Sequence, residues 1–228
     1  MAARRQAKPS GVIETLSAGY VAINRHLWVL LLPILVDVFL WFGPHVFHKR
    51  GGRLHPVTRI GLGPYLVGGW LTFPHYRRTA PPWVDVTPGL VFGRRLNDAE
   101  ARAQIERGVR AVLDLTGECE APPAFRAIAY RNIPILDLTI PTPRQFADAV
   151  DFIRAHATDG QKVYLHCKLG RSRSAAVAAA YLIAEGIAKD AEEAVALVRK
   201  ARPEIVIGPP TLAALERYAR KLATAPSG

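Results

Sequence analysis

The chain has 228 residues and a formal net charge of +11, and half of its residues are hydrophobic. This length and composition fit one ordinary domain with an extension, or two small domains, and exclude a disordered tail. The two cysteines, Cys119 and Cys167, cannot build a disulfide framework and lack the spacing of a structural zinc site, which excludes a small disulfide-stapled secreted protein.

The positive charge is concentrated in the N-terminal third. Residues 1–80 hold 10 Lys or Arg and 2 Asp or Glu, a net charge of +8, whereas residues 81–228 hold 20 and 17, a net charge of +3. The basic excess lies beside the most apolar run of the chain. This distribution is typical of a protein at a membrane surface and argues against nucleic acid as a partner.

That apolar run covers residues 27–42 and is interrupted only by Pro33 and Asp37. As a helix it reaches about 24 Å, less than the roughly 30 Å of a bilayer core, but extension at both ends makes it long enough to span. Trp28 and Trp41 near its ends suit the interfacial aromatic belt. Asp37 requires a partner or a place near the interface. We interpret the run as a membrane-associated helix; the alternative is a buried hairpin helix of a soluble domain.

A second, weaker apolar candidate covers residues 60–73, where four glycines and a proline disfavour an independent helix. The anchor is therefore either a two-helix hairpin or a single spanning or re-entrant segment. The basic stretch between the two candidates argues against export of that loop. Residues 79–83, TAPPW, are typical of a stiff linker. We expect a membrane anchor over residues 1–78 and a separate domain over residues 79–228.

From residue 83 onward, short strands alternate with helices. Strands are predicted over residues 90–92, 109–115, 128–135 and 162–166. Helices are predicted over residues 98–107, from 142 onward, and over 174–185, 190–200 and 211–222. This alternation predicts an α/β fold, a three-layer sandwich with a mainly parallel central sheet, preceded by the membrane-associated helical segment.

The most informative stretch is HCKLGRSRS, from His166 to Ser174, between a predicted strand and a predicted helix. Successive backbone amides that open onto a helix N-terminus form a cradle for a tetrahedral oxyanion. Arg173 adds a planar fork that binds two phosphate oxygens at once, and the same positive field favours the thiolate of Cys167. The alternative is a buried structural cysteine. The pattern predicts a nucleophilic Cys167 and a phosphate-binding loop made of Lys168, Leu169, Gly170, Arg171, Ser172 and Arg173.

These residues resemble the cysteine-dependent protein-tyrosine-phosphatase superfamily, and within it the compact dual-specificity phosphatases, over roughly residues 83–222. The loop CKLGRSRS, followed by AAYLI at residues 179–183, is similar to the phosphatidylglycerophosphate phosphatase branch, in which CKAGRSRS is typical. Leu169 stands where that branch has alanine. The resemblance implies phosphomonoester hydrolysis through a phosphocysteine, without a metal or other cofactor, because arginine and amides neutralise the phosphoryl charge.

The family also uses an aspartic acid about 30 residues before the cysteine, and Asp137 lies at that distance from Cys167. The resemblance implies that Asp137 protonates the leaving oxygen and then activates water. Asp114 and Asp148 are weaker alternatives, because the first ends a predicted buried strand and the second lies within a predicted helix.

The resemblance also implies roles for the two residues that flank the loop. Ser174 would stabilise the departing thiolate, and His166 would help set the reactivity of Cys167 through hydrogen bonding, unless it merely packs in the core. Cys119 could act as a resolving thiol that protects Cys167 from overoxidation, although an isolated buried cysteine is the plainer interpretation. A free catalytic thiol favours a reducing compartment, so we expect a membrane-anchored protein with its catalytic domain in the cytoplasm.

Lys168 and Arg171 add two cations to the loop, which favours substrates with several phosphates or an anionic membrane surface. Together with the predicted anchor, they make a lipid head-group phosphate our first expectation for the substrate. A phosphotyrosine or phosphoserine protein is the alternative. A non-catalytic, membrane-tethered phosphate-binding module and a rhodanese-like sulfur transferase are rivals of other classes.

Overall fold

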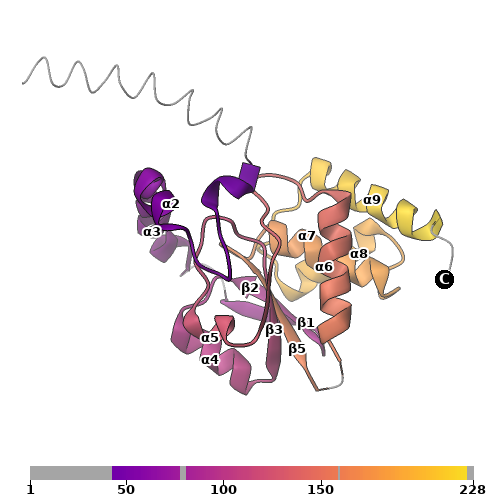
Figure 1. The fold of residues 1–228 in the computed structure, drawn as a ribbon. Helices are drawn as coiled ribbons and strands as arrows, with labels where there is room; N and C mark the ends of the chain where they lie inside the picture. Colours follow the sequence, from indigo (N-terminus) through magenta and orange to yellow (C-terminus); the bar gives the residue numbers. More distant parts are fainter. Residues whose placement is uncertain (1–42, 78–80, 159, 225–228) are drawn as a thin grey trace, which may run out of the picture. The chain divides into compact units, whose positions relative to one another are not determined.

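The computed structural model describes residues 43–77, 81–158 and 160–224, and Pro44–Gly228 form one compact unit. Its centre is a five-stranded sheet of order β1-β2-β5-β3-β4 (Figure 1). The strands β2, β5, β3 and β4 run parallel to their neighbours, and β1 pairs antiparallel with β2 at one edge. The predicted α/β fold is confirmed, and the sheet is mixed because β1 is antiparallel to its neighbour. The strands are β1 (Trp83–Thr87), β2 (Leu90–Arg94), β3 (Val109–Asp114), β4 (Ala129–Asn132) and β5 (Lys162–Cys167).

Helices cover both faces of the sheet (Figure 1). Alternate residues of a strand point to opposite faces. In β5, Val163 and Leu165 join the larger hydrophobic cluster and Tyr164 the smaller one. The larger cluster lies under α6 (Pro143–His156), α7 (Arg173–Ala184), α8 (Ala191–Ala201) and α9 (Pro209–Thr224), and the smaller lies under α4 (Asp98–Glu106) and α5 (Pro123–Arg126).

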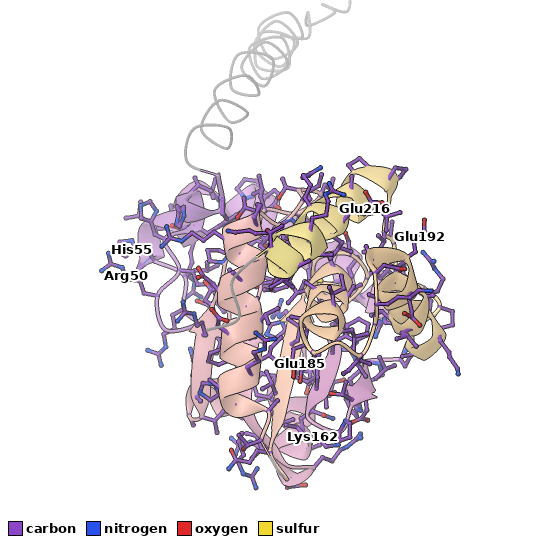
Figure 2. The ribbon with its side chains drawn as sticks, turned by 90° about the vertical axis from the view of Figure 1, so that its right-hand side faces the viewer. Arg50, His55, Lys162, Glu185, Glu192 and Glu216 are labelled. Carbon is purple, nitrogen blue, oxygen red and sulfur yellow. The ribbon has the colours of Figure 1, made fainter. Side chains whose placement is uncertain are left out.

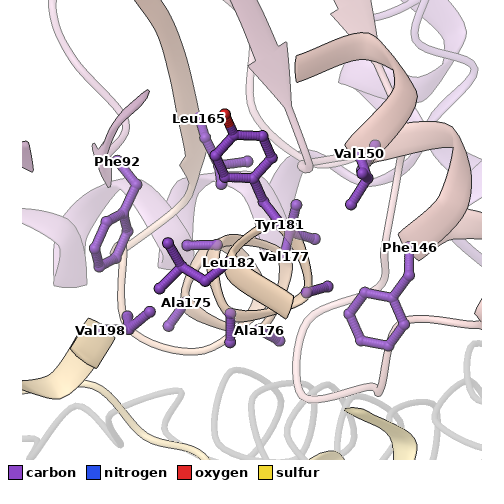
Figure 3. Packing of buried hydrophobic residues seen from close by; sticks show 14 of the residues in the cluster. Phe92, Phe146, Val150, Leu165, Ala175, Ala176, Val177, Tyr181, Leu182 and Val198 are labelled. Carbon is purple, nitrogen blue, oxygen red and sulfur yellow. The ribbon is translucent and has the colours of Figure 1, made fainter. Parts of the chain in front are cut away.

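The helix α7 is the centre of the larger cluster. Ten of its residues, from Arg173 to Leu182, are buried, and half of these are alanines that let neighbouring elements approach closely. Figure 3 shows α7 surrounded by side chains from β2, α6 and α8, among them Phe92, Phe146, Val150 and Val198. This packing fixes the N-terminus of α7 at the end of β5.

The predicted helix starts rest on side-chain caps. Asn97 and Glu100 form a capping box at α4, and Thr142 and Gln145 form another at α6. At α8, the Asp190 carboxylate accepts a hydrogen bond from the amide of Glu193 at 2.8 Å. These local patterns place the helices within a few residues of their expected starts.

The segment before the sheet contains η1 (Gly43–Phe47), α2 (Pro56–Gly61) and α3 (Gly63–Arg77). The predicted membrane run at residues 27–42 lies outside the described residues. The second membrane candidate, residues 60–73, is wrong as a spanning helix. Leu62 interrupts it, and the 15 residues of α3 reach only about 22 Å. Within the ranges that the structure describes, no helix is long and apolar enough to cross a membrane.

Residues 44–54 pack with the sheet domain. Phe47 and Leu54 are buried, and the side chain of Lys49 is 2% exposed. The expected division at residues 78 and 79 stays a prediction, whereas the compact unit begins at Pro44.

Candidate active site

The loop between β5 and α7 brings Cys167 to the end of a buried parallel strand. Cys167 Sγ accepts a hydrogen bond from the amide of Gly170 at 3.3 Å and lies 3.3 Å from Ser174 Oγ. Gly170 has a φ of +69°, and a Cβ there would lie 2.4 Å from the carbonyl carbon of Gly93. The left-handed backbone and this close approach both require glycine.

Groups outside the loop hold its remaining residues by donating hydrogen bonds to their carbonyl oxygens. The amide of Arg95 donates to Lys168 O at 3.2 Å, and the amide of Val206 donates to Arg171 O at 2.8 Å. In the third contact, the guanidinium of Arg202 donates to Leu169 O at 3.4 Å. Arg202 is fully buried, and the sequence pattern did not predict a role for it. Ser172 precedes α7 and its hydroxyl makes no capping hydrogen bond. The loop is therefore fixed by two segments far apart in sequence, one at Arg95 and one that carries Arg202 and Val206.

Arg173 is the best-held side chain of the site. Its Nη1 and Nη2 donate to the two carboxylate oxygens of Glu118 at 3.3 and 2.9 Å, and Nη1 also donates to Ile135 O at 2.8 Å. Burial would lower the pKa of Arg173, but the negative charges of Cys167 and Glu118 raise it well above its usual value. The guanidinium therefore stays charged and oriented. Glu118 was missed, because nothing in the sequence pattern links it to a residue 55 positions later.

Asp137 reaches the same arginine from the loop after β4. Its Oδ1 lies 2.9 Å from Arg173 Nη2, and its side chain is 44% exposed, so it faces the open side of the site. Leu138, next to it, adopts an unusual positive φ of 62°. The two weaker acid candidates lie elsewhere: Asp114 is fully buried, and Asp148 lies 3.9 Å from Arg144 on α6.

Behind the loop lies a buried polar network built on Asp114. Lys49 Nζ is 2.6 Å from Asp114 Oδ2, and it also donates to the backbone and side-chain oxygens of Thr116. The hydroxyl of Tyr130 donates to the same carboxylate oxygen at 2.7 Å. Burial would raise the pKa of Asp114, but the charge of Lys49 and these hydrogen bonds hold it well below its usual range. Lys49 therefore neutralises a carboxylate directly beneath the site.

His166 connects this network to the cysteine through the backbone. Its Nδ1 lies 3.4 Å from the carbonyl oxygen of Cys167, and its Nε2 lies 3.7 Å from Asp114 Oδ2, beyond hydrogen-bonding distance. Burial lowers the pKa of His166, and the charge of Lys49 lowers it further, against the opposing effect of Asp114. The imidazole is thus held neutral at the base of the loop.

The thiol of the second cysteine, Cys119, is unreactive in this arrangement. Cys119 is buried, and burial together with the neighbouring Glu118 raises its pKa to about 12. Its thiol is therefore protonated at neutral pH, which disfavours attack on an oxidised Cys167.

Lys168 and Arg171 are partly exposed at the rim of the loop.

A buried thiol that accepts an amide hydrogen bond, at a strand-to-helix loop with an arginine fork, is the arrangement of cysteine-based phosphatases. The family model for the dual specificity phosphatase catalytic domain matches residues 94–221, and the chain belongs to this family within the cysteine-based protein-tyrosine-phosphatase superfamily. The protein is therefore a cysteine-based phosphatase.

Two curated relatives and one solved structure illustrate the similarity. The rat phosphatidylglycerophosphatase and protein-tyrosine phosphatase 1 is 31% identical over 137 residues, which cover 56% of this chain and 70% of that protein. The mouse dual specificity protein phosphatase 2 is 31% identical over 112 residues, 48% of this chain and 34% of that protein. The crystal structure of PTPMT1 in complex with PI(5)P superposes with a TM-score of 0.57 at 26% identity, covering 63% of this chain and 97% of that one.

Proposed function

We propose that Cys167 is the nucleophile of a phosphomonoesterase whose phosphate site is the loop from Lys168 to Arg173. The thiolate attacks phosphorus, the bond from phosphorus to the leaving oxygen breaks, and protonated Asp137 gives its proton to that oxygen. Water then attacks the phosphocysteine, Asp137 takes its proton, and the phosphorus–sulfur bond breaks to release phosphate and the thiolate. Ser174, 3.3 Å from Sγ, is placed to stabilise that thiolate.

The observation that carries this proposal is the contact of Arg173 with both Glu118 and Asp137. Glu118 holds one edge of the guanidinium, while Asp137 occupies Nη2 at 2.9 Å. We infer that a phosphoryl group displaces Asp137 from Nη2, because a doubly charged phosphate can bind the guanidinium through two of its oxygens at once. The displaced carboxyl group would then lie beside the substrate, where a leaving oxygen needs its proton.

We propose a lipid head-group phosphate as the substrate and a membrane as the place of action. Lys168 and Arg171 at the rim of the loop favour a polyanionic surface, and the apolar run at residues 27–42 would keep the enzyme near it. The names of the rat relative and of the PTPMT1 complex, which refer to phosphatidylglycerophosphate and PI(5)P, support the same choice. Protein phosphatases are also among the relatives, so a phosphoprotein is the second candidate.

A substrate panel with the full chain tests both parts of the proposal. Phosphatidylglycerophosphate and phosphoinositides in mixed micelles are compared with phosphotyrosine peptides and para-nitrophenyl phosphate, all with a metal chelator. We expect kcat/KM at least about 10-fold higher for a lipid than for the peptides, a difference of about 1.4 kcal/mol in transition-state stabilisation. A preference for peptides would support the phosphoprotein alternative.

Paired cysteine variants test the nucleophile separately. Cys167→Ser should abolish hydrolysis of every substrate, because a serine hydroxyl is not ionised near neutral pH. Cys119→Ala is the matched control and should keep its activity. Residual Cys167→Ser activity above about 1% of the wild type would contradict the proposed nucleophile, since loss of a triad-type nucleophile costs several orders of magnitude.

A further inference from the structure

The helices α2 and α3 expose a concentration of apolar side chains. They lie outside the family match at residues 94–221. Nine large hydrophobic side chains of the described residues are exposed, and five of them belong to these two helices: Val57, Ile60, Tyr65, Val67 and Leu71. Ile60 is 82% exposed and Leu71 is 63% exposed. Scattered exposed hydrophobics need no explanation, but a group on two successive helices marks an interaction surface.

The same segment carries only positive charge. Residues 43–77 contain five Lys or Arg residues and no Asp or Glu: Lys49, Arg50, Arg53, Arg59 and Arg77. Lys49 is used internally by Asp114, whereas Arg50, Arg53 and Arg59 are exposed. Figure 2 shows Arg50 and His55 on the opposite side of the molecule from Glu192 and Glu216. Exposed apolar residues with arginines are typical of a surface that enters the interface of an anionic bilayer.

This segment borders the active site. A pocket of about 360 Å³ lies between α2–α3 and the segment that carries Glu118, the partner of Arg173. The ring of Phe73 on α3 lies 5.8 Å from the guanidinium of Arg95, whose amide holds the cysteine loop at Lys168 O. On α3, Tyr65 packs against the buried Phe47 with ring centroids 5.9 Å apart, which joins this helix to the domain that carries the site.

The loop that carries Asp137 also exposes apolar side chains. Leu138, beside Asp137, is 98% exposed, and Ile140 is 39% exposed. Because Asp137 contacts Arg173 at 2.9 Å, these side chains belong to the rim of the same site. Apolar side chains therefore occur both on α3 and on the acid-carrying loop.

We propose that α2, α3 and the tip of the loop at Leu138 form a docking surface for an anionic lipid bilayer. The apolar side chains enter the boundary between head groups and acyl chains, and the arginines pair with lipid phosphates. Docked in this way, the cysteine loop faces the head-group layer. The surface binds lipid whatever the substrate is; only its benefit for catalysis rests on the proposed function.

Depth measurements on the full chain test the surface directly. Ile60→Cys and Leu71→Cys are made in a Cys119→Ser/Cys167→Ser background, labelled with an environment-sensitive fluorophore, and mixed with phosphatidylcholine vesicles with or without phosphatidylglycerol. Ile187→Cys is the matched control, because Ile187 is 49% exposed and follows α7 at the end away from the cysteine loop. Since residues 1–42 are present in every variant, recruitment by the apolar run is the same in all.

We expect spin-labelled lipids to quench the probes at positions 60 and 71 in phosphatidylglycerol vesicles, less in pure phosphatidylcholine, and not at position 187. Equal quenching at all three positions, or none at 60 and 71, would overturn the proposal; the second result would leave α2–α3 free for a protein partner. This assay contains no substrate, so it stands even if lipid hydrolysis is not observed.

Activity measurements complete the test. Ile60→Asp/Leu71→Asp should lower hydrolysis of vesicle-borne phosphatidylglycerophosphate at least about 10-fold. In this variant, two apolar side chains that would enter the bilayer are replaced by carboxylates that anionic lipids repel. Hydrolysis of para-nitrophenyl phosphate should not change, and Ile187→Asp should change neither activity. If the wild type hydrolyses vesicle lipid and the double variant hydrolyses it at the same rate, the docking proposal fails while the proposed function stands.

Discussion

Replacing Lys49 with methionine tests the buried network beneath the cysteine loop. Methionine keeps most of the side-chain volume and removes the ammonium, so Asp114 is left charged and fully buried without its 2.6 Å partner. Removing one partner of a buried ion pair costs about 3–5 kcal/mol. For a unit of this size, about 2–4 °C of Tm is lost per kcal/mol, so we expect Tm to fall by roughly 6–20 °C.

The loss of stability in Lys49→Met should depend on pH, and the titration of His166 sets the direction of that dependence. In the wild type the pKa of His166 is lowered by burial and by Lys49, so below about pH 6.5 the native state binds fewer protons than the unfolded state and stability falls. In Lys49→Met the lowering effect of Lys49 is gone and Asp114 remains. The native-state pKa of His166 therefore rises, and an imidazolium 3.7 Å from Asp114 partly replaces the ammonium.

Thermal unfolding of both proteins between about pH 5.5 and pH 8 measures this effect. We expect the gap in Tm to narrow towards acidic pH. Adding Asp114→Asn to Lys49→Met should recover part of the lost stability, because no buried charge then remains unpaired. A gap that does not vary with pH, or a cost below about 1 kcal/mol, would refute this account of the network.

Three further perturbations have clear expectations. Asp137→Asn should slow release of alcohol leaving groups by about 10²–10⁴-fold and slow release of para-nitrophenol less; equal single-turnover losses would exclude the acid role. Gly170→Ala should lower kcat/KM at least about 100-fold, because its Cβ would lie 2.4 Å from Gly93 and displace the loop, and full activity would show that the loop tolerates the change. Deleting residues 1–43 should leave a folded, active unit, whereas deleting 1–78 also removes Lys49 and should lower its stability; equal melting curves would contradict this division.

The parts of the site that were predicted are those that are local in sequence. His166 to Ser174 form one strand-to-helix loop, so their spacing alone defines the phosphate cradle. The capping boxes at Asn97 and Thr142 likewise need only three residues of context. Asp137 required knowledge of the family, because its approach to Arg173 depends on how the loop after β4 folds back.

The missed residues act across long sequence separations. Glu118 and Lys49 contact partners 55 and 65 positions away, and each belongs to a stretch whose local pattern fits an exposed loop. Lys49 lies in a basic segment, so it is taken for a surface charge until its carboxylate partner, Asp114, is known. Strand β1 was also missed, because Pro81 and Pro82 directly before it suggested a linker. It forms by antiparallel pairing with β2, which the sequence of β1 alone does not specify.

Trapping the phosphoenzyme tests the central claim most directly. Full-length protein is mixed with phosphatidylglycerophosphate in micelles, quenched with acid within one turnover and digested, and the peptide that contains Cys167 is analysed by mass spectrometry. We predict one added phosphoryl group on Cys167 and none in Cys167→Ser. Turnover accompanied by a phosphoryl group on another residue, or persisting in Cys167→Ser, would contradict the account.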